Sequence, residues 1–291
     1  MKFAHLRSEA QLTPRLAVVI EGGALFLDEL MPNPPAILQE LIDRGESGLA
    51  EVSQVVDAAT AGGAEPVPIT QLRYCSAVLR PAQIIAIGAN YAAHASELKL
   101  RSESAMTIFS LWPNSLTGHD ATTKWPGDLT TQVDYEAELG VIIGRAAHEV
   151  PVLDALEYVW GYTVVNDITA RDLQFSEAQW SRCKSFDGFT PTGPVVVTAD
   201  EIPDPQDLWL TTNLDGRIMQ DASSGDMVRS VAEIIHLLSR SATIPPGTLI
   251  STGSPGGAGY SRKPPVFLQD GSTVTITIDK IGSLTTHCRI I

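Results

Sequence analysis

The segment VDYEAELGV, residues 133–141, alternates acidic and apolar residues in the manner of a β-strand. Side chains two positions apart share one face of a strand, so Glu136 and Glu138 are expected to project side by side. Ala137 and Leu139 form the opposite, apolar face. Taken alone, this pattern fits a solvated strand face equally well. The residues that follow at 141 and 143 are also apolar, however, which indicates that the strand becomes buried further along.

A third acidic residue, Asp167, ends the apolar strand predicted over residues 161–166. An acid in this position is more often a cap or turn residue, so Asp167 is informative only together with Glu136 and Glu138. Three carboxylates without Cys or clustered His form a hard oxygen site, which suits Mg²⁺ or Mn²⁺ and disfavours zinc. We therefore expect these three residues to hold Mg²⁺ or Mn²⁺ and to leave positions open for water and a chelating substrate.

The segment GANYAAHASE, residues 88–97, places His94 and Glu97 three positions apart on a short helix predicted over residues 90–98. At this spacing the two side chains share a helix face, so the carboxylate can orient and polarise the imidazole, and the pair can activate water. Isolated pairs of this kind are usually solvated, so the interpretation depends on the acids lying nearby. We interpret the remaining histidines as structural: His5, His119, His148, His236 and His287.

Two further segments contain polar groups suited to binding an anion. Lys184, in KSFDGF, lies beside apolar and glycine residues and can place a positive charge against a developing oxyanion, although most lysines are solvated. The segment ISTGSPGGAG, residues 250–259, places backbone amides and hydroxyls at a strand end, which suits a carboxylate or phosphate. A flexible loop is an equally good interpretation of it. The glycine order matches neither a P-loop nor a dinucleotide-binding fingerprint.

The 291 residues are enough for one large domain and one small one. The leading segment is predicted to contain a hairpin around Gly22-Gly23, a helix over residues 36–44 and a second apolar-periodic segment over residues 49–59. We place the boundary at Arg80-Pro81. This predicts a small N-terminal α/β domain over residues 1–80 and a catalytic domain over residues 81–291.

After the boundary the sequence is dominated by β-branched and alternating runs. Strands are predicted over residues 84–87, 136–143, 161–166, 195–198, 208–214, 248–252 and 273–278. A capping box, Ser230 to Glu233, begins a helix predicted over residues 231–238. Because the strands do not alternate regularly with helices, we expect an α+β, strand-rich fold, a mixed β-roll or β-sandwich, and not a doubly wound sheet.

Composition excludes several classes of protein. With 44% hydrophobic and 19% charged residues, the chain is neither intrinsically disordered nor collagen-like. Its formal charge of −14 disfavours nucleic acid and anionic membrane surfaces as partners. No export signal or apolar run long enough to span a membrane is visible, so we expect a cytoplasmic protein. Cys75, Cys183 and Cys288 are far apart in sequence, which predicts reduced thiols.

Five motifs, in this order, resemble the fumarylacetoacetate hydrolase family. They are IGANYAAHASE from residue 87, DYEAEL from residue 134, NDITARDLQ from residue 166, KSFDGF from residue 184 and STGSPGG from residue 251. The match spans residues 81–291 and is similar to the acylpyruvase-like branch, of the bacterial two-domain type. It implies a mixed β-roll, a homodimer, and a small leading domain like residues 1–80.

The resemblance also implies a role for each motif. It places the divalent metal on the three acids, assigns water activation to His94 and Glu97, and assigns support of developing negative charge to Lys184. The substrate-binding positions that it implies are Arg171, Gln174, Thr252, Gly253 and Ser254. Residues 99–105 resemble a mobile segment that closes as a lid. Many members carry a Lys-Pro pair where this chain has Trp112-Pro113, so we expect an altered pocket.

The resemblance implies a metal-dependent hydrolase acting on ketonic substances, with a small 2-oxo acid as substrate. Such an acid can chelate the metal through its carboxylate and keto oxygens, so that the enolate of pyruvate becomes a stabilised leaving group. Hydrolysis of acylpyruvates or other 2,4-dioxo acids, as in aromatic or deoxysugar catabolism, is the first hypothesis. Oxaloacetate decarboxylation, or a 2-oxo acid isomerase or hydratase, is the alternative on the same fold. A non-catalytic binding protein is a third reading, which the intact motifs disfavour.

Overall fold

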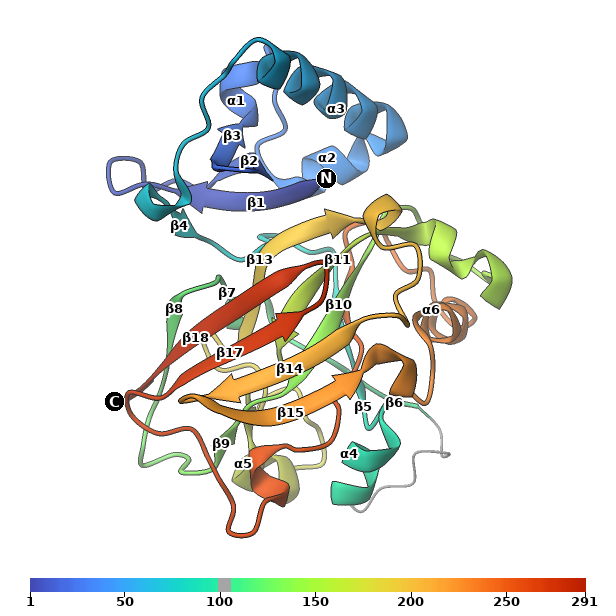
Figure 1. Ribbon diagram of the computed structural model, residues 1–291. Coiled ribbons are helices and arrows are strands. Elements are labelled where there is room, and N and C mark those ends of the chain that lie inside the picture. Colours follow the sequence, from blue (N-terminus) through green and yellow to red (C-terminus); the bar gives the residue numbers. More distant parts are fainter. Residues whose placement is uncertain (99–105) are drawn as a thin grey trace.

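The computed structural model of the protein describes residues 1–98 and 106–291 (Figure 1). The lid expected at residues 99–105 lies outside the described residues.

The strands are β1 (Lys2–Arg7), β2 (Arg15–Ile20), β3 (Gly23–Phe26), β4 (Arg73–Tyr74), β5 (Ile84–Gly88), β6 (Thr107–Ser110), β7 (Leu116–Thr117), β8 (Ala121–Trp125), β9 (Val133–Asp134), β10 (Ala137–Ile143), β11 (Val159–Asn166), β12 (Thr169–Ala170), β13 (Thr190–Thr198), β14 (Trp209–Leu214), β15 (Arg217–Ser223), β16 (Leu249–Ser251), β17 (Thr273–Ile278) and β18 (Gly282–Ile290). The helices are α1 (Leu27–Leu30), α2 (Leu38–Asp43), α3 (Gly45–Ala61), α4 (Ala92–Glu97), α5 (Arg171–Ser176) and α6 (Val231–Ser239). Short 3-10 helices are η1 (Ile69–Gln71), η2 (Pro113–Ser115), η3 (Val152–Tyr158), η4 (Ala199–Glu201), η5 (Ser224–Asp226) and η6 (Gly259–Ser261).

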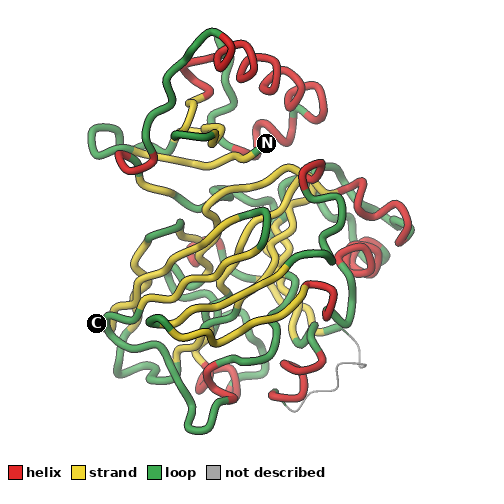
Figure 2. Tube along the Cα trace, in the orientation of Figure 1, coloured by secondary structure: helices red, strands yellow, loops and turns green. Residues whose placement is uncertain are grey.

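Two sheets pack against each other to form the body of the molecule (Figures 1 and 2). Over the described residues, the larger sheet has the order β3-β2-β1-β13-β11-β10-β16-β5-β6, with β4 beside β1 and β7 beside β13. The smaller has the order β15-β14-β17-β18-β8, and a two-stranded piece joins β12 to β9. β17 and β18 pack on β11, and β14 packs on β10. The predicted strand-rich α+β fold is confirmed.

The centre of the larger sheet is buried on both faces. All seven residues of β10 and all eight of β11 are buried, which accounts for their nearly continuous apolar sequences. Gly140 on β10 has no room for a side chain, because a Cβ there would lie 2.8 Å from the side chains of Thr163 and Val165.

The capping box predicted at the start of α6 is confirmed. The Ser230 hydroxyl accepts from the Glu233 amide, and the Glu233 carboxylate accepts from the Ser230 amide.

The leading segment is joined to the larger sheet by β1, a strand that the sequence analysis did not predict. β1 pairs antiparallel with β13, where Phe3 lies opposite Val196, and also with β2 and β4. The predicted hairpin forms as β2 and β3, and α1 to α3 lie beside it in the upper part of Figure 1. The domain boundary at Arg80-Pro81 falls in a segment without helix or strand and stays a prediction.

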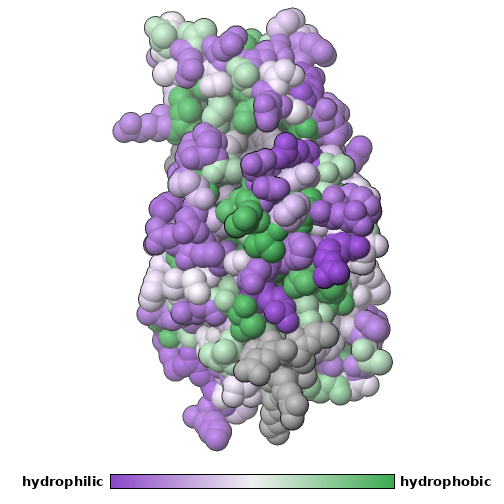
Figure 3. Space-filling view, turned by 90° about the vertical axis from the view of Figure 1, so that its right-hand side faces the viewer, coloured by the Kyte–Doolittle hydropathy of each residue, from purple (hydrophilic) through white to green (hydrophobic). Residues whose placement is uncertain are grey.

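Most apolar side chains lie in the interior. On the face shown in Figure 3, hydrophobic residues form small groups among hydrophilic ones, as in an ordinary globular protein. Over the described residues, none of the helices has the length and apolar content to cross a membrane.

His5 connects β1 to α2 through its imidazole ring. Its Nδ1 lies 3.2 Å from the carbonyl oxygen of Ser76 and 3.1 Å from that of Ala77, and its Nε2 accepts from the Leu38 amide at 3.0 Å. These contacts require a neutral ring with its hydrogen on Nδ1. Burial of the ring lowers the pKa of His5 to about 4, although both carbonyls favour the charged form.

We expect His5 to make the folded state sensitive to acid. Because the pKa of His5 is about 4 when folded and about 6.5 when unfolded, its contribution is fully present above pH 6.5 and is lost as the pH falls toward 4. The loss amounts to about 2 kcal/mol at pH 5. Urea unfolding at pH 7 and pH 5 should show a smaller difference in His5→Gln than in the wild type. The exposed His148→Gln serves as a control and should keep the wild-type difference; an unchanged difference in His5→Gln would contradict this account.

Candidate metal centre and active site

Three buried carboxylates meet where β10 begins and β11 ends. Ala137 on β10 lies opposite Asn166 on β11, so this antiparallel register places Glu136 next to Asp167. Glu138 joins them, and each of the three offers an oxygen within 4.8 Å of the others. Their exposed fractions are 3% or less. The convergence expected from the sequence is therefore confirmed, and a solvated strand face is excluded.

The three acids ionise unequally. Burial raises the pKa of Glu138, and repulsion by Asp167 and Glu136 raises it well above the usual range. Burial likewise raises the pKa of Asp167, to about 6, despite the nearby Lys184 ammonium. Burial also opposes ionisation of Glu136, but the charges of Lys184 and Arg171 outweigh it and hold the pKa of Glu136 well below its usual range.

Lys184 contributes a buried positive charge to the cluster. Its Nζ donates to a carboxylate oxygen of Glu136 and to one of Asp167, each at 2.6 Å, and to the Thr169 hydroxyl at 2.8 Å. Burial would lower the pKa of Lys184, but the charges of Asp167 and Glu136 raise it, so the amine stays protonated. The positive charge of Lys184 was expected from the sequence, but the KSFDGF segment contains no signal that identifies its partners.

Arg171 contributes the second buried positive charge. Its Nε donates to Asp134 at 2.9 Å, its Nη2 forms an ion pair with Glu136 at 2.7 Å, and its Nη1 donates to the Gln174 side-chain oxygen at 2.9 Å. Asp134 also accepts from the backbone amides of Gly259 and Tyr260. Arg171 thereby fixes Glu136 in place and connects the acids to the loop that follows β16.

The donor set fits a divalent cation. The cluster carries more negative than positive charge. When all groups are ionised, two cations, Lys184 and Arg171, face four carboxylates, those of Asp134, Glu136, Glu138 and Asp167, which leaves two negative charges in excess. The Oδ1 atom of Asp167 is buried and has no hydrogen-bond partner among the described residues. A buried carboxylate oxygen without a partner is costly, and a hard cation would satisfy it. The cluster can therefore hold a divalent metal ion.

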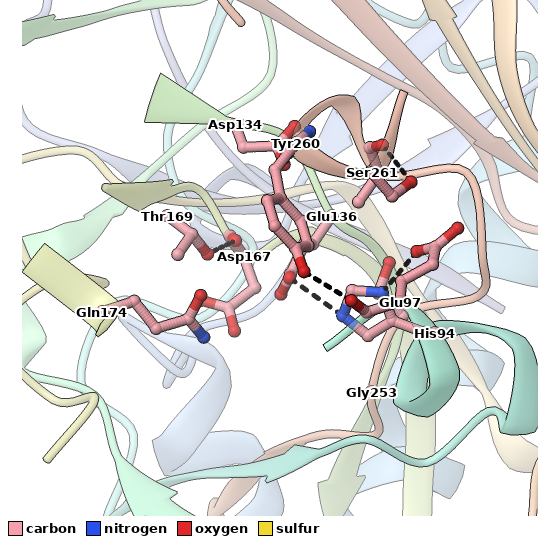
Figure 4. A network of polar contacts seen from close by, with 12 residues as sticks. His94, Glu97, Asp134, Glu136, Asp167, Thr169, Gln174, Gly253, Tyr260 and Ser261 are labelled. Atoms are coloured by element: carbon pink, nitrogen blue, oxygen red, sulfur yellow. Dashed lines mark hydrogen bonds and ion pairs between the residues drawn. The ribbon is translucent and has the colours of Figure 1, made fainter. Parts of the chain in front are cut away.

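His94 lies between Glu97 and the acidic cluster (Figure 4). Its Nδ1 is 3.1 Å from a Glu97 oxygen and its Nε2 is 3.2 Å from a Glu136 oxygen, while the other Glu97 oxygen accepts from the Gly257 amide at 2.7 Å. Burial lowers the pKa of His94, but the contacts with Glu136 and Glu97 outweigh burial and raise it. The pair is therefore part of the site, in contact with the cluster.

The residues expected to bind substrate separate into two groups. A small cavity is lined by the three acids, His94 and Lys184, and also by Gln174 and Ser254. Arg171, Thr252 and Gly253 are not among its lining residues. The Thr252 hydroxyl donates to the Leu139 carbonyl, and the Gly253 amide donates to Glu138 at 2.9 Å, so both support β10 and its acid.

Some residues that build the site were not identified from the sequence. Asp134 anchors Arg171, and the Ser251 hydroxyl donates to Glu138 at 2.6 Å. Both lie inside motifs quoted above, yet their partners are far away in sequence. Phe109 and Trp180 line the cavity, whereas Trp112, which was expected to alter the pocket, is 44% exposed and does not line it.

Comparisons with known proteins identify the family of the chain and several similar solved structures. Residues 83–289 match the family model described as fumarylacetoacetate (FAA) hydrolase C-terminal. The chain is similar to a fumarylacetoacetate hydrolase from Exiguobacterium antarcticum, with 33% identity, full coverage of both chains and a TM-score of 0.83. It is also similar to maleylpyruvate hydrolase from Sphingobium sp., solved with manganese(II) and pyruvate, with 27% identity, coverage of 100% and 99%, and a TM-score of 0.82. A 5-carboxymethyl-2-hydroxymuconate delta-isomerase from Mycobacterium smegmatis has 28% identity, coverage of 100% and 99%, and a TM-score of 0.76.

We expect Arg171 to be critical for stability. In Arg171→Met the buried carboxylates of Asp134 and Glu136 each lose an ion-pair partner, which costs about 3 to 5 kcal/mol of unfolding free energy. Arg145→Met removes an exposed arginine whose ion pair with Glu157 spans a similar distance, and should change stability by less than about 1 kcal/mol. Urea denaturation of both variants at pH 7 makes the comparison, and equal losses would show that burial of the Arg171 pairs is unimportant.

Proposed function

The chain belongs to the fumarylacetoacetate hydrolase family, and we propose that it is a divalent-metal-dependent hydrolase cleaving a carbon–carbon bond in acylpyruvates or other 2,4-dioxo acids. The observation that carries this proposal is the contact between the His94–Glu97 pair and the buried three-acid cluster. The similar maleylpyruvate hydrolase, in complex with manganese(II) and pyruvate, supports both the ion and the class of substrate. Formation of a homodimer, implied by the family, is part of the same proposal.

Glu136, Glu138 and Asp167 would hold Mg²⁺ or Mn²⁺, because both ions prefer oxygen ligands. The bound ion would supply a Lewis acid that polarises the carboxylate and keto oxygens of a 2-oxo acid and stabilises enolate charge. Lys184 lies against two of these acids, so its ammonium is also placed to support negative charge that develops on a substrate oxygen there.

His94 and Glu97 provide the base for hydrolysis. The Nε2 atom of His94 faces Glu136 in this structure; with Glu136 held by the cation instead and the Nδ1 hydrogen donated to Glu97, the neutral ring would take a proton from water at Nε2, and Glu97 would then stabilise the imidazolium. The water oxygen adds to the C4 carbonyl carbon of the 2,4-dioxo acid. The C3–C4 bond breaks with its electron pair going to the pyruvate fragment as an enolate. Protonation of that enolate at C3 gives pyruvate, and the acyl fragment leaves as a carboxylic acid.

Decarboxylation of oxaloacetate is the competing activity on the same acids. It passes through the same enolate but consumes no water, so it gives the His94–Glu97 pair no role. An isomerase, the activity named for one structural neighbour, also requires no hydrolytic water. The contact between His94 and Glu97 therefore favours hydrolysis over decarboxylation, whereas isomerisation would use the same pair to move protons.

We predict one high-affinity Mn²⁺ site per chain. Calorimetric titration of chelator-treated protein should give a stoichiometry of one, and Glu138→Gln should weaken binding by at least about 10-fold because a charged ligand is lost. Glu157→Gln changes an exposed glutamate outside the cluster and should bind Mn²⁺ like the wild type. Unchanged affinity in Glu138→Gln, or full hydrolytic activity in the chelator-treated protein, would refute the metal assignment.

We predict that His94→Ala separates hydrolysis from decarboxylation. Cleavage of acetylpyruvate with Mn²⁺ present should fall by about 10² to 10⁴, the usual contribution of a general base. Any oxaloacetate decarboxylation by the same protein should stay within about 10-fold, because that reaction transfers no water proton. The exposed His148→Ala is the matched control. Equal loss of the two activities would argue against water activation as the role of His94.

A further inference from the structure

One part of the cavity wall is apolar and carries no charge. Beyond the acids and their polar neighbours, the cavity is lined by Ile87, Gly88, Ala89, Leu98, Phe109 and Trp180. These residues come from the end of β5, from β6, from the residue after α4 and from the segment after α5. The proposed mechanism uses none of them.

Phe109 and Trp180 form the aromatic part of this wall. Their ring centroids are 5.4 Å apart and the ring planes meet at 68°, the edge-to-face arrangement that aromatic pairs prefer. The Lys184 ammonium lies 5.5 Å from the Phe109 ring centroid, so the aromatic pair is directly beside the acidic cluster. A substrate whose 2-oxo acid end is held by the cluster would therefore place its acyl group within reach of these rings.

Gly88 allows the indole to take this position. A Cβ on Gly88 would lie 2.4 Å from Cζ3 of Trp180, a separation that carbon atoms do not tolerate. Only glycine at residue 88 therefore lets the indole approach the end of β5 this closely. An alanine there must move the indole, and with it the wall of the cavity.

Among the described lining residues, the groups able to carry positive charge are His94 and Lys184. Both already contact carboxylates of the protein, His94 at Glu97 and Glu136, and Lys184 at Glu136 and Asp167. Neither cation is therefore free to pair with a carboxylate at the far end of an acyl group, whereas the aromatic wall offers favourable contacts to an uncharged group. Burial of an unpaired charge costs several kcal/mol, whereas burial of an apolar group is favourable.

We propose that this site selects 2,4-dioxo acids whose acyl group is uncharged and apolar, with Trp180 and Phe109 as the specificity-determining residues. The inference deepens the proposed function and rests on it for the identity of the reaction. It predicts weaker binding of dioxo acids whose acyl group ends in a second carboxylate.

A matched pair of unreactive ligands tests the pocket without requiring turnover. 2-Oxohexanoate and 2-oxoadipate share the 2-oxo acid end and six carbon atoms, but the first ends in a methyl group and the second in a carboxylate. Calorimetric titration of the Mn²⁺-loaded protein should show roughly 30-fold tighter binding of 2-oxohexanoate. Equal or tighter binding of 2-oxoadipate would overturn the proposal.

Variants of the wall identify the residues responsible. Trp180→Ala should weaken binding of 2-oxohexanoate by about 10-fold and change that of 2-oxoadipate by less than about 2-fold, while Trp180→Phe should retain most of the preference. Gly88→Ala, which displaces the indole, should reduce the preference without removing an aromatic group. Trp209→Ala, at an exposed tryptophan on β14, is the control and should behave like the wild type. A full preference for 2-oxohexanoate in Trp180→Ala would overturn the assignment of this residue.

Failure of the pocket assignment can be distinguished from failure of the proposed function. If the protein prefers 2-oxohexanoate but cleaves no acylpyruvate, the assigned reaction is wrong, but the assignment of the apolar wall as a binding surface is retained. If it cleaves acylpyruvates but prefers those with a second carboxylate, the reaction stands and the specificity assignment is wrong.

Discussion

Glu136, Glu138 and Asp167 repel one another in an interior where little water screens their charges, and much of the surrounding structure compensates for this repulsion. Lys184 and Arg171 supply two buried positive charges. Hydrogen bonds from a hydroxyl and a backbone amide stabilise Glu138. A negative surplus nevertheless remains, and it lies at a small cavity that His94 and Lys184 also line. A site of this kind gains stability from a divalent cation, which connects the energetics of the fold to its chemistry.

The sheet topology brings the motifs together from distant parts of the sequence. β16 lies beside β10, so the glycine-rich loop after β16 reaches Glu138. β5 runs parallel to β16 and delivers α4, with His94 and Glu97, to the same end of the sheet. The Asn90 side chain donates to the Thr252 carbonyl at 2.8 Å and fixes the start of this helix against the loop. Each motif therefore depends on its neighbours in the sheet for its position.

Local patterns predicted the features that depend on neighbouring residues. The alternation of residues in the 133–141 segment predicted that Glu136 and Glu138 lie close together, and the Ser230 capping box predicted the start of α6. β1 was not predicted from the sequence. Its four buried residues lie between polar ends, and its partner strand, β13, lies almost 200 residues away in the sequence. The contacts of Asp134 and Trp180 were likewise invisible, since they are set by sheet register and by packing against distant residues.

The central claim is that the three carboxylates jointly bind one divalent cation, and crystallography with Mn²⁺ tests it most directly. Anomalous scattering from crystals grown with Mn²⁺ locates the ion without reference to activity. This account predicts a peak within about 2.5 Å of oxygens from Glu136, Glu138 and Asp167. A peak elsewhere in the molecule, or none at these three residues in crystals saturated with Mn²⁺, would contradict it.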